Sequence, residues 1–196
     1  MKPFNQLTST LLPITTCDID TDQIIPATYL KVTNKDGLGD GCFARWRFHE
    51  DGSLNLNFAL NRPEYQGAQI LVAGDNFGTG SSREHAPWAL LGWGFRAVVS
   101  SSFADIFHNN SLKNGLLPVI VDADTLDHLF GLVHKDPGTE VTIDLSEQGL
   151  TLPNGRTISF PIDAFSKICM LEGVDQMGYL LNHEPDILAY EREKVL

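Results

Sequence analysis

Hydrophobic and polar positions follow two periods in the middle of the chain, and together they predict a layered α/β fold. Three short runs of branched apolar residues have the length of buried strands: 69–73, 97–99 and 116–121. Apolar residues at helical spacing predict a helix after each run, over 83–91, 102–114 and 126–133. Ser102 and Asp105 have the spacing of a capping box at the start of the second helix. This order is typical of a mixed, mostly parallel sheet flanked by helices.

The pattern changes after Pro137-Gly138. Apolar and polar residues alternate over 141–145, which predicts a half-buried strand, and the turn Asn154-Gly155 predicts a hairpin. One further helix should end at Gly173. A final helix begins near Pro185, and we expect a C-terminal helical extension over about 184–196.

Residues 31–62 form the least periodic segment, rich in glycine and aromatic residues. We expect a long irregular loop there, and long loops in small domains are often functional. A length of 196 residues is enough for one domain with a sizeable core, so we expect a single domain over 1–196.

The charge balance narrows the classes of partner. The chain has 14 Lys and Arg against 25 Asp and Glu, which gives a formal net charge of -11. Such a field repels phosphate, so nucleic acid and anionic membranes are disfavoured as main partners. A small anionic substrate needs only a locally positive pocket. No apolar run approaches the ~18 residues of a membrane span.

The cysteines indicate a reducing compartment. Cys17, Cys42 and Cys169 are odd in number and widely spaced, so they predict neither a disulfide framework nor an iron–sulfur ligand run. We expect buried thiols in a cytoplasmic protein. The segment Met1–Pro13 lacks the apolar core of a signal peptide.

The densest cluster of candidate chemistry is the glycine-rich segment 74–86, between a predicted strand and a predicted helix. Gly74, Gly78 and Gly80 would let backbone amides converge as an anion-binding nest. Ser81 and Ser82 would follow at the positive end of the helix. Arg83 is suited to gripping a carboxylate by two bonds. The segment therefore predicts an anion site with a hydroxyl at its centre.

Several other readings of this segment are weaker. No Gly-Lys-Ser/Thr occurs, no third glycine completes a dinucleotide fingerprint, and no Gly-x-Ser-x-Gly elbow is present. His85 lacks a second histidine at metalloprotease spacing, so it fits a first-turn or core position better than a ligand. A plain helix cap, with a solvated first turn at 83–85, remains the structural alternative.

The stretch Asn76–Ala86 resembles the signature of the swivelling domain of the aconitase superfamily. Three further stretches fit the same family: 20–26, 102–107 and 114–118. Chain length, together with residues 86–90 and 29–31, makes the isopropylmalate isomerase small subunits of leucine biosynthesis the most similar group.

The resemblance implies an α/β swivelling domain that acts as one part of a hydro-lyase. A [4Fe–4S] cluster would be supplied by a partner large subunit, in a heterodimer or a dimer of heterodimers, with a small dicarboxylate as substrate. By position, Ser81 matches the base that takes a carbon-bound proton, while Ser82, Arg83 and Asp22 match substrate-binding groups. The matching specificity loop is Thr28, Tyr29, Leu30 and Lys31.

Two functional alternatives stay open on the sequence. A homoaconitase-like or methylmalate-type dehydratase would keep the chemistry and change the substrate. A non-catalytic module that binds anions or RNA would keep the fold and lose the reaction, although the acidic charge disfavours RNA. Tyr29 and Leu30 also have a simpler interpretation as core residues at the end of a strand.

Overall fold

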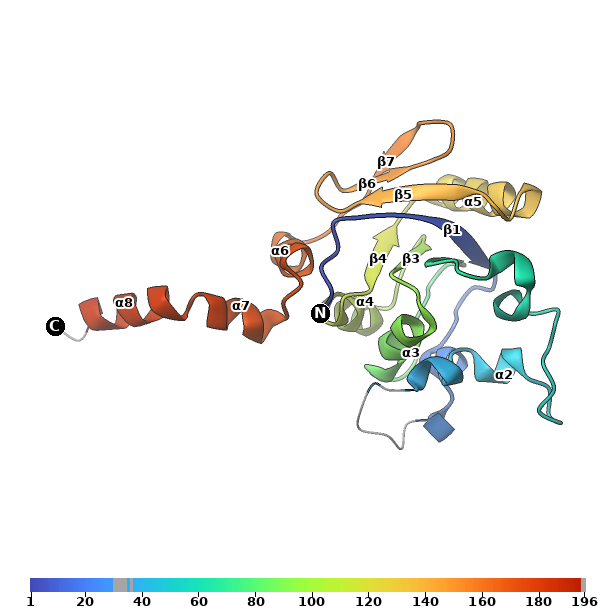
Figure 1. Cartoon of the computed structure of the whole chain (residues 1–196), viewed down its shortest axis with the longest axis horizontal. Coiled ribbons are helices and arrows are strands. Elements are labelled where there is room, and N and C mark those ends of the chain that lie inside the picture. Colours follow the sequence, from blue (N-terminus) through green and yellow to red (C-terminus); the bar gives the residue numbers. More distant parts are fainter. Residues whose placement is uncertain (30–34, 36, 195–196) are drawn as a thin grey trace.

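The computed structural model describes residues 1–29, 35 and 37–194. In this part of the chain, seven strands form one sheet in the order β4-β3-β2-β1-β5-β6-β7 (Figure 1). Their bounds are β1 Gln6–Ile14, β2 Ile70–Ala73, β3 Ala97–Ser100, β4 Leu117–Ile120, β5 Glu140–Asp144, β6 Gly149–Thr151 and β7 Thr157–Ser159. Strands β1 to β4 pair in parallel and β5 to β7 antiparallel, which confirms the predicted mixed sheet and C-terminal hairpin.

Strand β1 lies at the centre of the sheet, although the sequence pattern did not predict it. It pairs in parallel with β2 and antiparallel with β5, so it joins the two halves of the sheet. Its first half pairs polar positions such as Thr8 with Thr142 of the neighbouring strand. Only Leu11, Leu12 and Ile14 supply its deeply buried apolar residues. An apolar run that short does not stand out from a loop.

The helices cover both faces of the sheet. Their bounds are α1 Thr21–Ile24, α2 Ala44–Arg47, α3 His85–Trp93, α4 Asp105–Asn114, α5 Ala123–Lys135, α6 Ala164–Glu172, α7 Gln176–Asn182 and α8 Glu184–Lys194. In Figure 1, α3 and α4 lie on one side of β1 and α5 lies on the other. Helices α7 and α8 run outward from the body, away from the sheet. No helix in the described ranges is long and apolar enough to cross a membrane.

Two predicted helix starts are wrong. Helix α3 begins at His85 rather than at residue 83, so Ser81 and Ser82 lie in the preceding loop. Helix α4 begins at Asp105, after Ala104, and Ser102 does not cap it. The Ser102 hydroxyl instead donates to the Asp75 carboxylate at 2.6 Å. The capping-box pattern failed because a tertiary acceptor lies closer to this serine than the helix amides do.

The segment between β1 and β2 contains short helices rather than only irregular loop. Besides α1 and α2, it has the 3-10 helices η1 Ala27–Tyr29, η2 Leu38–Gly41, η3 Ala59–Asn61 and η4 Pro63–Tyr65. The Arg47 guanidinium is buried and donates to the carbonyls of Asp40 and Cys42 at 3.1 and 3.4 Å. Its Nε also donates to Asn61 Oδ1 at 3.3 Å. One buried cation therefore ties these short helices together.

Candidate active site

Three loops meet at the carboxyl ends of the parallel strands. The loop after β1 contacts the loop after β2, because the Asp18 amide donates to the Asp75 carbonyl at 2.9 Å and Asp20 forms a β-bridge with Thr79. The loop after β2 contacts the loop after β3 through a bridge between Phe77 and Phe103. Crevices at the carboxyl ends of such strands are the usual ligand sites in α/β sheets.

A short capped helix positions Asp22. The Asp20 carboxylate accepts from the Gln23 amide at 2.8 Å, and the Gln23 side chain accepts from the Asp20 amide at 2.8 Å. This reciprocal cap fixes the first turn of α1, where Asp22 lies. The Asp-x-x-Gln spacing at 20–23 is a sequence signal for that helix.

Asp22 and Arg83, which are distant in sequence, form an ion pair through Asp22 Oδ1 and Arg83 Nη1. The Arg83 side chain is 25% exposed and the Asp22 side chain 42%. An exposed pair of this kind contributes little to stability, about 0–1 kcal/mol. It does hold one edge of the guanidinium, and the remaining N–H groups of Arg83 can face a ligand.

The expected glycine nest is only partly present. The Gly74 amide donates to the Ile14 carbonyl at 3.0 Å, and the Gly78 amide donates to the Ile19 carbonyl at 2.7 Å. Both amides are therefore occupied, so Gly74 and Gly78 shape the loop but do not themselves offer a donor to an anion. Gly78 is needed for packing instead, because a Cβ there would come within 2.2 Å of the Phe107 ring.

The free donors lie farther along the loop. In the described part of the chain, the amides of Gly80, Ser81 and Ser82 have no hydrogen-bond acceptor. Gly80 has a φ of 87°, a left-handed conformation that side-chain-bearing residues rarely adopt. The Thr21 hydroxyl donates to the Ser81 carbonyl at 3.0 Å and holds the loop against α1. The anion site is thus reduced to three successive amides beside Arg83.

The hydroxyl groups of Ser81 and Ser82 are exposed, and neither has a partner within the described residues. Thr21 is 2% exposed, and its role in fixing Ser81 was not predicted. Its only sequence signal is its place between Asp20 and Asp22. The structure therefore presents Ser81 on a fixed backbone with a free side chain.

Asp75 anchors the start of the loop. Its Oδ1 accepts from the hydroxyls of Ser102 and Ser101 at 2.6 and 2.8 Å. These hydrogen bonds, that of Ser102 first, lower the pKa of the Asp75 carboxyl below its ordinary value. The Ser102 hydroxyl also accepts from the Asn76 amide at 2.9 Å. None of these residues has a local sequence pattern that predicts a place in the site.

The predicted specificity loop is described only in part. Thr28 and Tyr29 lie in the 3-10 helix η1, where Thr28 is exposed and Tyr29 half-buried. The Tyr29 ring packs on Gly41, since a Cβ there would lie 2.7 Å from Tyr29 Cγ. Leu30 and Lys31 lie outside the described residues. Tyr29 thus has a packing role in the loop, but not at the end of a strand.

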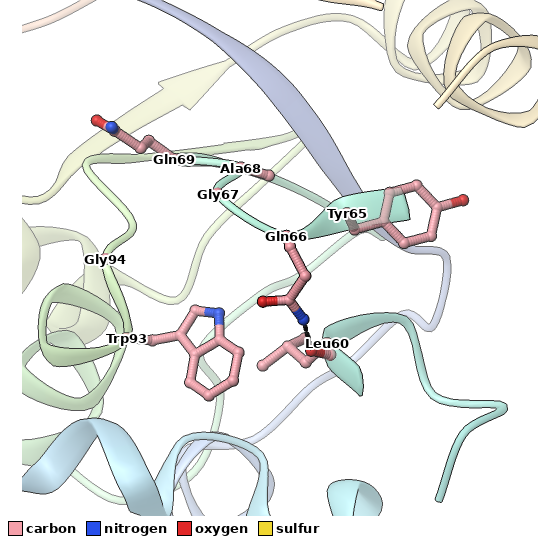
Figure 2. Close-up of a pocket in the computed structure, with 8 residues that line it drawn as sticks. All are labelled: Leu60, Tyr65, Gln66, Gly67, Ala68, Gln69, Trp93 and Gly94. Atoms are coloured by element: carbon pink, nitrogen blue, oxygen red, sulfur yellow. Dashed lines mark hydrogen bonds between the residues drawn. The ribbon is translucent and has the colours of Figure 1, made fainter. Parts of the chain in front are cut away.

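The cavity in Figure 2 is a different place from the loop that carries Ser81 and Arg83. It measures about 350 Å³ and is lined by Leu60, Tyr65, Gln66, Gly67, Ala68, Gln69, Trp93 and Gly94. The Gln66 side chain points toward Leu60 and donates to its carbonyl at 3.4 Å. None of the predicted site residues within the described ranges lines this cavity. Ser81 and Ser82 instead lie on an open face of the molecule.

The cysteines differ in environment. Cys42 and Cys169 are buried, whereas Cys17 is exposed, so the expectation of three buried thiols was wrong for Cys17. Burial raises the pKa of the Cys42 thiol well above its ordinary value, which keeps it protonated and unsuited to bind a metal. Among the described residues, no group of three or more His, Cys, Asp and Glu side chains has the arrangement of a metal site.

Comparison with known proteins identifies the family. The family model for the aconitase C-terminal domain matches residues 1–124, and the LeuD model, described as LeuD_N, matches residues 127–164. A 3-isopropylmalate dehydratase small subunit from Roseiflexus sp. (strain RS-1) is 61% identical over 194 residues, which cover 99% of this chain and 95% of the relative. One from Chloroflexus aggregans is 56% identical over 191 residues, covering 97% and 94%.

A solved structure supports the same assignment. The crystal structure of the 3-isopropylmalate dehydratase LeuD from Methanocaldococcus jannaschii superposes with a TM-score of 0.66 at 29% identity, covering 95% of this chain and 99% of that one. The fold and the relatives agree along nearly the whole length. The chain belongs to the aconitase C-terminal domain family and, within it, to the 3-isopropylmalate dehydratase small subunits.

Proposed function

We propose that this chain is the small subunit of an isopropylmalate isomerase, a hydro-lyase of leucine biosynthesis. It would interconvert 2-isopropylmalate and 3-isopropylmalate by dehydration and rehydration. The observation that carries the proposal is the meeting of Ser81, three free amides and the Arg83–Asp22 pair on one open face. Strong similarity to dehydratase small subunits along the chain supports the choice of substrate.

Ser81 is proposed as the base that removes the proton from the carbon next to a carboxylate. An unaided serine hydroxyl is far too weakly acidic for this role, so its alkoxide must be stabilised by nearby donors. The Arg83 cation supplies such a donor, and so do the amides of Gly80, Ser81 and Ser82, which have no acceptor among the residues that the structure describes. The same groups would stabilise the negative charge that develops on the substrate as the proton leaves.

Arg83 and Ser82 are proposed to hold a substrate carboxylate. The planar guanidinium matches a carboxylate with two parallel N–H bonds, and the Ser82 hydroxyl adds a third donor. Asp22 would orient the guanidinium by keeping one of its nitrogens occupied. This arrangement also explains how a chain of net charge -11 binds a dianion, because the local donors act at contact distance.

We propose that a large subunit completes the site, in a heterodimer or a dimer of heterodimers. A [4Fe–4S] cluster held by that subunit would act as the Lewis acid on the substrate hydroxyl. The buried thiols of this chain do not suit the cluster, since burial raises the pKa of Cys42 and of Cys169 and disfavours the thiolate that binds iron. The open face around Ser81 supports a site closed by a partner.

Within that assembly, the whole chain 1–196 would act as one swivelling domain. Residues Thr28–Lys31 would contact the isopropyl group, with Leu30 as the apolar contact and Lys31 as its neighbour. A cytoplasmic location fits the odd number of free cysteines.

Reconstitution with the large subunit tests the proposal. The purified chain and a large subunit of the same organism are combined, and the enoic intermediate is followed by ultraviolet absorbance. The wild-type complex should turn over 3-isopropylmalate, and Ser81→Ala should lower kcat by about 10³-fold or more. Ser159→Ala, an exposed serine on β7, is the control and should be fully active. Full activity of Ser81→Ala would exclude Ser81 as the base.

A further inference from the structure

The two C-terminal helices carry a large share of the exposed apolar side chains of the described residues. We call residues 176–194, which form α7 and α8, the C-terminal arm. Figure 1 shows this arm running outward from the sheet and its covering helices. Six large apolar side chains on it are exposed: Met177 63%, Leu180 52%, Leu181 61%, Ile187 42%, Leu188 43% and Tyr190 58%.

On α7 the apolar residues share one face. Met177, Leu180 and Leu181 follow the spacing i, i+3, i+4, which places them side by side on the helix. A surface helix normally turns such a stripe toward its own core. Here the three side chains remain more than half exposed. A contiguous exposed apolar patch on an otherwise charged chain is typical of an interface with another protein.

The base of the arm adjoins the candidate active site. A cavity of about 290 Å³ is lined by Gln176 and Met177 from α7 and by Glu84 and Trp88 from the α3 segment. Glu84 directly follows Arg83, so the arm starts beside the face that carries the site. The contact of the Tyr179 ring with the Phe165 ring, at 5.1 Å, fixes the arm to α6. A partner that covers Ser81 and Arg83 is therefore within reach of the arm.

Charge argues against a second copy of the chain as the occupant. The arm contains four acidic and two basic residues, and the whole chain carries a net charge of -11. Two acidic arms, or an arm on the body of another copy, would repel each other. Helix α7 carries no charged residue, whereas the exposed apolar side chains of α8 share that helix with the exposed Glu184, Asp186 and Glu191. Such a surface is complementary to an apolar groove bordered by Lys and Arg.

We propose that the C-terminal arm is a docking element for the large subunit, which receives α7 and α8 in an apolar groove with basic edges. This inference rests on the proposed function, since it takes that subunit as the partner. The face around Ser81–Arg83 and the arm then form one continuous interface. The arm contributes affinity, while the loop contributes chemistry.

The test compares two matched pairs of exposed leucines in the full-length chain. Leu180→Ser with Leu181→Ser removes side chains that are 52% and 61% exposed on the arm. Leu54→Ser with Leu56→Ser removes side chains that are 50% and 68% exposed elsewhere. Calorimetry with the large subunit should show a Kd at least about 30-fold higher for the arm pair, and within threefold of wild type for the control pair. Circular dichroism checks that both variants fold.

Charge complementarity has its own readout. The Kd of the wild-type complex should rise with added salt, because opposite charges across the interface are screened. Glu184→Gln with Asp186→Asn should raise the Kd by several fold at low salt and flatten the salt dependence. An unchanged salt slope in this variant would contradict the basic edges of the groove.

Failure of the docking role and failure of the proposed reaction give different results in these experiments. Wild-type affinity in the arm pair, or an equal loss in both pairs, overturns the docking role. Light scattering that shows a dimer of the free chain, converted to monomer by the arm pair without change in large-subunit affinity, assigns the arm to a second copy and also overturns it. A complex that forms through the arm but does not dehydrate 3-isopropylmalate would refute the proposed reaction alone.

Discussion

Two glycine-rich segments, residues 37–41 and 74–80, look alike in the sequence but behave differently in the structure. In the first, the backbone at Gly39 packs so closely on α3 that a Cβ would lie 2.4 Å from the Gly92 carbonyl oxygen. Arg47 donates to the carbonyl of Asp40 in this segment and to that of Cys42, which directly follows it. In the second, the bonded part ends at Thr79, and the following amides are free within the described residues.

The comparison shows what separates a packing loop from a site. Glycine permits close approach or a left-handed turn in both segments. Polar groups of a packing segment are satisfied inside the protein, as native structures require of buried groups. At residues 80–82 the amides have no acceptor among the described residues and directly precede an arginine, which suits an anion site.

Arg47 and Arg83 differ in the same way as the two segments: one belongs to the packing and the other to the site. Arg47 is 9% exposed, and its guanidinium lies 4.2 Å from the centroid of the Trp93 ring. Burial lowers the pKa of Arg47 below its ordinary value, although it remains charged. Arg83 keeps a quarter of its side chain exposed and has one carboxylate partner. Arg47 therefore stabilises the fold, and Arg83 is available to a ligand.

The largest expected effect comes from adding a methyl group to the packing segment. Gly39→Ala should destabilise the fold by about 3 kcal/mol, because the new Cβ meets backbone atoms that cannot move aside. Thermal or urea unfolding measures the loss. In Gly80→Ala the nearest atom to the new Cβ lies 3.4 Å away, so only the left-handed backbone costs energy, about 1 kcal/mol. Equal losses in the two variants would contradict the distinction between the segments.

A second effect, in binding, follows from Arg83→Lys. The lysine keeps the positive charge and loses the two-bond grip, so the KM of the assembled enzyme should rise about 100-fold with a smaller change in kcat. Stability should stay within about 0.5 kcal/mol of wild type, because the Asp22 pair is exposed. Steady-state kinetics and unfolding curves measure the two quantities.

Arg47→Lys is the matched control, and it should lower stability while it leaves substrate binding unchanged. It should lose about 2 kcal/mol of stability, since buried carbonyls lose their donors, and its KM should be unchanged. A rise in KM for Arg47→Lys equal to that for Arg83→Lys would remove the proposed division between the arginines.

The smallest expected effect is a loss of stability at low pH in the loop after β2, which Asp75 anchors. The pKa of Asp75 is lowered in the folded state, so its hydrogen bonds stabilise the loop above the unfolded value of about 4 and are lost as the pH falls through the lowered folded value. Ser102→Ala should move the pKa of Asp75 back toward its ordinary value, and a carbon-13 titration of the carboxyl measures this. No change would show that Ser102 does not stabilise the carboxylate.

The sequence predicted the parallel strands β2 to β4 because their short apolar runs are buried, apart from the half-buried Ile120. It also predicted the C-terminal hairpin, from its turn, and the mixed sheet. It missed β1, whose polar first half is stabilised by pairing with distant strands. It also missed α7, a short helix whose apolar face is exposed. Local periodicity records burial within one element and carries no information on pairing between distant ones.

For the candidate site, the sequence singled out Asp22, Ser81, Ser82 and Arg83, and the structure brings Asp22 and Arg83 together. It could not tell which amides of the loop are free. The carbonyls of Ile14 and Ile19 that occupy Gly74 and Gly78 come from another part of the chain. The contributions of Thr21 and Asp75 depend on tertiary hydrogen bonds and have no local pattern.

Hydrogen exchange at the reacting carbon of the substrate tests the central claim most directly. The complex of this chain with the large subunit is incubated with 3-isopropylmalate in deuterium oxide, and proton NMR follows the loss of the carbon-bound hydrogen. If Ser81 takes that proton, Ser81→Ala should bind substrate normally through Arg83 and exchange about 10³-fold more slowly than wild type. Exchange at the wild-type rate in Ser81→Ala would contradict the account.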